Sequence, residues 1–129
     1  MDSTVLREVQ LQVRKMYTIL NEVMDLSRQM AQMADRGDEV SLQMLTDMRS
    51  EPLERLRSIR GILMEYRQRL PGPEGDRLAA LLNGEKAQVP EEAELAAQVD
   101  QMHRMLENVL SVDRRLSLKL AGDGSFYKE

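Results

Sequence analysis

A chain of 129 residues with a formal net charge of −4 has room for one domain with a modest core, and a second domain is not expected. Aromatic residues make up only 3% and charged residues 31%, so the core must consist of Leu, Val, Ile and Met, as in helical bundles. An acidic balance without a basic, aromatic-rich stripe argues against nucleic acid as a partner, and the absence of cysteine excludes disulfides, a thiolate nucleophile and a zinc site with Cys ligands.

Apolar residues in three-four spacing predict a first helix over residues 4–36. Ser3 or Thr4 can cap its start, and Gly37 can adopt the left-handed conformation that closes a helix. Ser27 is the only polar residue of the apolar stripe along this helix. The stripe consists of Leu6, Val9, Val13, Met16, Leu20, Val23, Ser27, Met30 and Ala34.

A second helix is expected over residues 39–70, with a stripe of the same spacing. Pro52 lies inside it, but the apolar phase is unchanged on both sides, so we expect one kinked helix and not two. The polar turn ADRGDE at 34–39 separates the two stripes. Together they predict an antiparallel, coiled-coil-like hairpin, whose narrow seam is typical of proteins that work through helix contact.

The segment PGPEGD at 71–76 ends the second helix, a short connector helix is expected over 76–82, and a third long helix over 90–120. Asp113 breaks the apolar stripe of the third helix. The sequence therefore predicts an all-α fold: an antiparallel bundle of three long helices with a short connector helix, forming one domain over 1–120. We expect residues 121–129 to be a flexible tail, in which Phe126 and Tyr127 either anchor a partner or fold back onto the bundle.

Residues suited to catalysis or metal binding are not found in a suitable pattern. His103 is the only histidine, and no carboxylate or second histidine lies at the spacing of a metal pair. The acidic run at 91–94 lacks the spacing of a calcium loop, and the glycine-rich segments lack the Lys-Ser or Lys-Thr of a phosphate-binding loop. We therefore expect no enzyme, no catalytic or metal-binding residues and no cofactor.

Surplus apolar residues on the third helix indicate a binding surface for a partner helix. The chain has ten methionines, which either fill gaps in the core or line a groove that can repack around a partner. Arginines are dense on the second helix, and several have an acid three or four residues earlier, so they form either a solvated face or a basic patch for an acidic partner. The residues expected to bind the partner are Val99, Met102, Met105, Leu106, Val109, Leu110 and Val112.

Residues 20–63 and 106–120 resemble the flagellar type III export chaperones of the FlgN and FliT kind. The similarity lies in a long helix ending in the small acidic turn Gly37-Asp38, a second helix with Leu42, Leu45 and Arg49, and a final helix with the sequence LENVLSVDRRLSLKL. The resemblance implies a chaperone that holds the C-terminal helices of hook-associated or filament-cap proteins for export.

Two other functions stay open at this stage. The apolar stripes could close a homodimeric structural coiled coil, or the chain could be a regulatory adaptor. No segment approaches the roughly 18 apolar residues of a membrane span, and the charged N-terminal segment is unlike a secretory signal, so a cytoplasmic location is expected.

Overall fold

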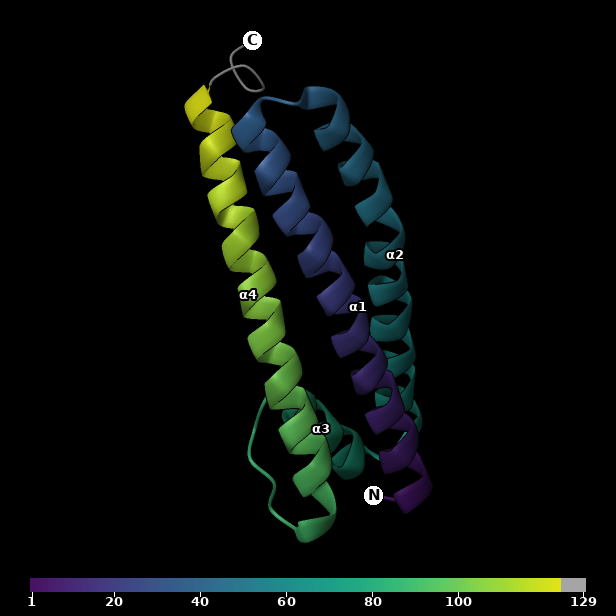
Figure 1. Cartoon of the computed structure of the whole chain (residues 1–129). Coiled ribbons are helices and arrows are strands. Elements are labelled where there is room, and N and C mark those ends of the chain that lie inside the picture. The colour runs from purple at the N-terminus through teal and green to yellow at the C-terminus, as the bar shows by residue number, and fades with distance from the viewer. Residues whose placement is uncertain (124–129) are drawn as a thin grey trace.

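The structure, a computed structural model, describes residues 1–123, which are almost entirely helical and contain no strand. Its elements are α1 (Ser3–Arg36), α2 (Glu39–Arg69), α3 (Gly72–Leu82), a 3₁₀ turn at Pro90–Glu92, and α4 (Ala93–Asp123). Figure 1 shows α1 as a long rod between α4 and α2, with the short α3 near the end where the N-terminus lies. The all-α prediction is confirmed, and the four helices pack together.

The turn between α1 and α2 follows the chemistry of its residues. Gly37 has a φ of 69°, and its N–H donates to the Ala34 carbonyl at 3.1 Å. The Asp38 carboxylate accepts the Ser41 N–H at 3.0 Å, and this hydrogen bonding lowers the pKa of Asp38. At the other end of α1 the capping residue is Asp2, and not the expected Ser3 or Thr4.

Helix α2 continues through Pro52 without a break, and the proline ring is buried. A proline in this position removes one backbone hydrogen bond, but buried apolar residues lie on both sides of it, Leu42 and Leu45 before and Ile59 and Leu63 after. The prediction of a single helix is therefore confirmed.

The connector helix ends at Leu82 as predicted but begins earlier, and the last long helix differs from the prediction at both ends. Helix α3 begins at Gly72 and not at residue 76, because Pro73 lies in its first turn, where the missing N–H costs nothing. The expected third long helix starts with the 3₁₀ turn and becomes α-helical at Ala93, then continues to Asp123 instead of ending at 120. Residues 124–129, with Phe126 and Tyr127, lie outside the described residues, so the flexible tail stays a prediction.

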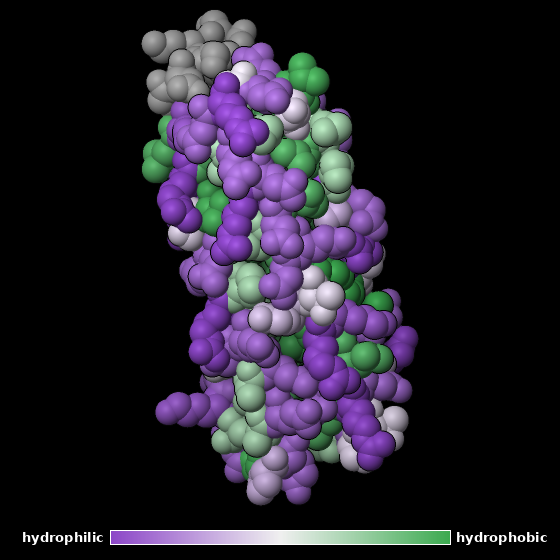
Figure 2. Space-filling view, viewed as in Figure 1, coloured by the Kyte–Doolittle hydropathy of each residue, from purple (hydrophilic) through white to green (hydrophobic). Residues whose placement is uncertain are grey.

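The core is divided into two apolar clusters. The larger joins α1, α2, α3 and α4, and its fully buried members include Val9, Val13, Leu78 and Leu95. The smaller lies near the α1–α2 turn and consists of Met30, Ala34, Leu42, Leu45 and Leu116. Figure 2 shows that hydrophilic side chains cover most of one face of the molecule, with apolar ones in separate patches between them. Among the helices described, none has the length and hydrophobicity needed to cross a membrane.

Candidate functional site

An open groove lies between α2 and α4. Helix α1 packs along both of these helices, whereas α2 and α4 approach each other only at isolated points. At one end α3 fills the space between them by packing against both, and its Leu78 and Leu81 are fully buried. Beyond α3 the space stays open and forms the α2–α4 groove.

The groove has an apolar floor and two unlike walls. Its volume is about 240 Å³. Met16 and Leu20 of α1 form the floor, and α4 contributes an apolar wall. The wall from α2 combines leucines with arginines. The lining residues are Met16, Leu20, Leu53, Leu56, Arg57, Arg60, Met102 and Leu106.

The predicted partner-binding residues divide between this groove and the core. Met102 and Leu106 line the groove, but Met102 is buried in the larger cluster, whereas Leu106 is 37% exposed. Leu110, one turn further along α4, is 42% exposed. Met105 is half-buried against the larger cluster.

The other three predicted residues are core residues. Val99, Val109 and Val112 are buried in the larger cluster, so Val112 belongs to the core and not to the surplus apolar surface of the helix. Val112 is buried because α1 and α4 contact each other over a broad surface, in which Met24 of α1 is also buried. Periodicity identified the helix that has surplus apolar residues, but it did not show which of these residues are buried in the core.

Ser27 and Asp113, the polar residues that interrupt the apolar stripes of α1 and α4, both form hydrogen bonds with Arg49. Arg49 of α2 donates one hydrogen bond to the Ser27 hydroxyl at 2.9 Å and another to the Asp113 carboxylate at 2.7 Å. Ser27 is fully buried, and the side chains of Arg49 and Asp113 are 17% and 36% exposed. This polar layer separates the two apolar clusters and ties α1, α2 and α4 together, as a single buried polar residue fixes register in coiled coils.

The charge at the groove comes mainly from α2. Arg57 forms an ion pair with Glu54, and Arg60 forms none within residues 1–123.

His103 lies over the loop after α3, where its Nδ1 is 3.3 Å from the place a Cβ on Gly84 would occupy. No group of His, Cys, Asp or Glu in the described part of the chain is arranged to hold a metal ion.

A second ion pair orders the loop between α3 and α4. The Glu92 carboxylate is buried and accepts two hydrogen bonds from Arg77, at 2.7 and 2.9 Å, and one from the Gln88 N–H at 2.9 Å. The hydrogen bonds from Arg77 lower the pKa of Glu92 from its ordinary 4.5 to about 2. The sequence showed Glu92 only as part of the acidic run at 91–94, because nothing in the local pattern links it to Arg77.

Comparisons with protein-family models, curated proteins and solved structures find no match to this chain. The function is therefore inferred from the α2–α4 groove and the charges around it.

Proposed function

We propose that this chain is a cytoplasmic chaperone of the export type, which binds an amphipathic helix of a protein partner in the α2–α4 groove. In this proposal the long helices act as an antiparallel three-helix bundle, α3 is the connector, and the partner supplies a fourth helix. The resemblance to flagellar export chaperones names the partner class as the C-terminal helices of hook-associated or filament-cap proteins.

The observation that carries the proposal is the exposure of Leu106 and Leu110 beside a groove whose other end already holds a helix. The space between α2 and α4 accepts α3 and buries Leu78 and Leu81 completely. From Met102 to Asp113, where the polar layer crosses, α4 advances roughly 16 Å, so the open part suits a helix of about three turns.

Charge complementarity indicates which kind of helix fits. Arg57 and Arg60 lie on the α2 wall, and the α4 wall is apolar at Met102 and Leu106. A partner helix with apolar residues at i, i+3, i+4 and i+7 and acidic residues along one edge would satisfy both walls. We therefore favour an acidic amphipathic helix.

The proposal is tested with a fluorescently labelled three-turn peptide that has leucines at these positions and glutamates on one edge. The Leu106→Asp/Leu110→Asp variant is the perturbation. Because complete burial of a leucine stabilises by about 1.5–3 kcal/mol, burying the exposed two-fifths of both side chains contributes about 1–2.5 kcal/mol. We expect the variant to bind about tenfold to fiftyfold more weakly by anisotropy, with an unchanged unfolding midpoint.

Leu118→Asp is the matched control, because Leu118 is on the same helix but is 72% exposed and outside the groove. It should bind like the parent chain. A peptide with lysines in place of the glutamates should bind more weakly. Equal binding of the parent chain and the double variant would refute the groove as the binding site, and loss of folding in the double variant would assign those leucines to the core.

A homodimer is the second candidate, and it has its own supporting observation. Val40, Met44 and Met48 lie four residues apart on α2 and are 83%, 57% and 53% exposed, which places them on one side of the helix. If sedimentation equilibrium finds a stable dimer that Met44→Asp/Met48→Asp dissociates, and no helical peptide binds, the homodimer replaces the chaperone proposal.

A further inference from the structure

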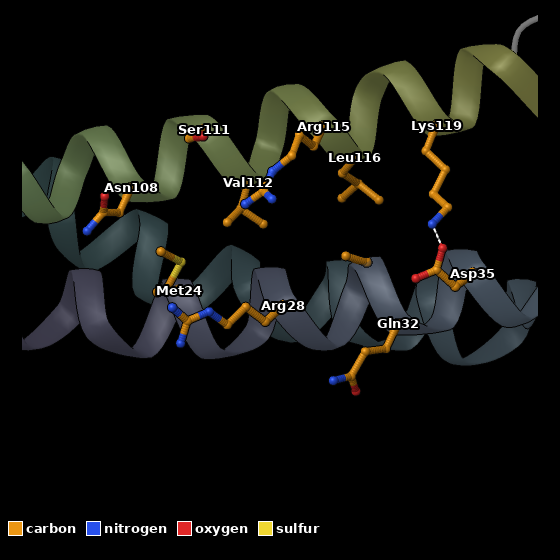
Figure 3. Close-up of a pocket in the computed structure, with 11 residues that line it drawn as sticks. Met24, Arg28, Gln32, Asp35, Asn108, Ser111, Val112, Arg115, Leu116 and Lys119 are labelled. Carbon is orange, nitrogen blue, oxygen red and sulfur yellow. Dashed lines mark ion pairs between the residues drawn. The ribbon is translucent and has the colours of Figure 1, made fainter.

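A second pocket, separate from the α2–α4 groove, lies between α1 and α4. Its volume is about 580 Å³, and it shares no lining residue with the groove. Met24, Val112 and Leu116 are buried beneath it. Figure 3 shows side chains from α4 above and α1 below, with the ion pair between Lys119 and Asp35 at one end.

The polar side chains of this pocket are mainly hydrogen-bond donors. Arg28 and Arg115 form no ion pair within residues 1–123, and the side chains of Asn108 and Ser111 form no hydrogen bond there. Since Asp35 is the only carboxylate in the lining and is paired with Lys119, the three cations leave two positive charges in excess. This local excess of positive charge contrasts with the net charge of −4 of the whole chain.

The donors and the apolar surface occur at the same end of the pocket. In Figure 3 the side chains of Arg28 and Arg115 extend toward Met24 and Val112, away from the Lys119–Asp35 pair. Guanidinium groups bind carboxylates and phosphates through paired, charge-assisted hydrogen bonds. Met24 and Val112 are core residues, 5% and 7% exposed, and the surface that they keep lines the pocket beside the two guanidinium groups. A short hydrocarbon attached to the anion would cover this remaining apolar surface.

We propose that this pocket binds a small organic oxyanion, a carboxylate or phosphate on a short apolar chain. Arg28 and Arg115 hold the oxyanion, Asn108 and Ser111 donate further hydrogen bonds, and Met24 and Val112 contact the chain. The inference goes beyond the proposed function and does not depend on it, since no residue is shared.

The test is an NMR titration of the full chain with hexyl phosphate, hexanoate and inorganic phosphate at low salt, where exposed charges are least screened. Saturable binding of hexyl phosphate or hexanoate, with shifts of the Met24 and Val112 methyl groups, is the expected result. The tighter of the two identifies the anion. Inorganic phosphate should bind at least tenfold more weakly than hexyl phosphate, and equal affinity would overturn the apolar part of the site.

The Arg28→Gln/Arg115→Gln variant should weaken binding at least tenfold. Arg7→Gln/Arg114→Gln is the matched control, because it changes the net charge equally, with one arginine on α1 and one on α4, both outside the lining. The control should bind within twofold of the parent chain. An equal loss in both variants, or no saturable binding of either organic anion, would overturn the proposal.

Discussion

Replacing Arg49 by alanine removes the guanidinium that joins Ser27 and Asp113 in the polar layer. The Ser27 hydroxyl is then buried without its donor, and Asp113 loses its counter-charge between two apolar clusters. Since these groups belong to three different helices, the substitution weakens the packing of α1, α2 and α4 at one level of the structure.

The size of the effect follows from burial. A hydrogen bond to a charged group contributes about 1.5–3 kcal/mol, and the lower half of that range applies because the Asp113 side chain is 36% exposed. The fully buried Ser27 hydroxyl adds about 1 kcal/mol when it loses its partner. We expect Arg49→Ala to lower the free energy of unfolding by about 2–3 kcal/mol.

Urea denaturation followed by circular dichroism measures this change as a midpoint lower by about 1 M or more. Arg60→Ala is the control, because Arg60 is on the same helix and has no ion pair in the described part of the chain, so its cost should stay below about 0.5 kcal/mol. A double-mutant cycle with Asp113→Ala should give a coupling of about 1 kcal/mol. Strict additivity of the two substitutions would refute the argument that the layer joins the helices.

Two further predictions concern the connector and the helix it packs on. Gly75→Ala should lower the urea unfolding midpoint, since a Cβ there would lie 2.7 Å from the Arg67 carbonyl oxygen. Gly61→Ala should raise the free energy of unfolding by about 0.5–1 kcal/mol in the same titration, because a Cβ there meets no atom within 4 Å. Because the pKa of Glu92 is depressed to about 2, its pairing with Arg77 stabilises the fold above the ordinary pKa of 4.5 and is lost as the pH falls from 4.5 toward 2. Glu92→Gln should therefore remove about 1–2 kcal/mol of that pH dependence, measured as unfolding free energy against pH; an unchanged pH profile would contradict the assignment.

The methionine content by itself did not predict which methionines are buried. Met24, Met30 and Met102 are buried in the core, while Met44, Met48 and Met64 are more than half exposed. The gap-filling interpretation therefore holds for the three buried methionines, whereas the three exposed ones do not line the α2–α4 groove, so a methionine-lined partner groove stays a prediction. A sequence pattern does not separate them, because a methionine beside an apolar stripe is buried only where a neighbouring helix reaches it.

Helix boundaries and the order of elements followed from the sequence by itself, because caps, turns and three-four periodicity are local properties of the chain. Gly37 and Asp38 placed the first turn, and the unbroken phase around Pro52 predicted one continuous helix. The start of the connector helix was wrong, because tertiary packing of Gly75 against the end of α2 supports an earlier start, and α4 ends at Asp123 and not at 120.

Only the tertiary structure showed the role of the polar residues that interrupt the apolar stripes. Ser27 and Asp113 looked like separate defects in two helices, and Arg49 looked like one member of a charged face, yet the three side chains form one polar layer. The same holds for the binding surface: Val112 is core and Leu110 is exposed because α4 packs along α1 but not along α2. Periodicity determines which residues share a helix face, and the positions of the neighbouring helices determine which part of that face is covered.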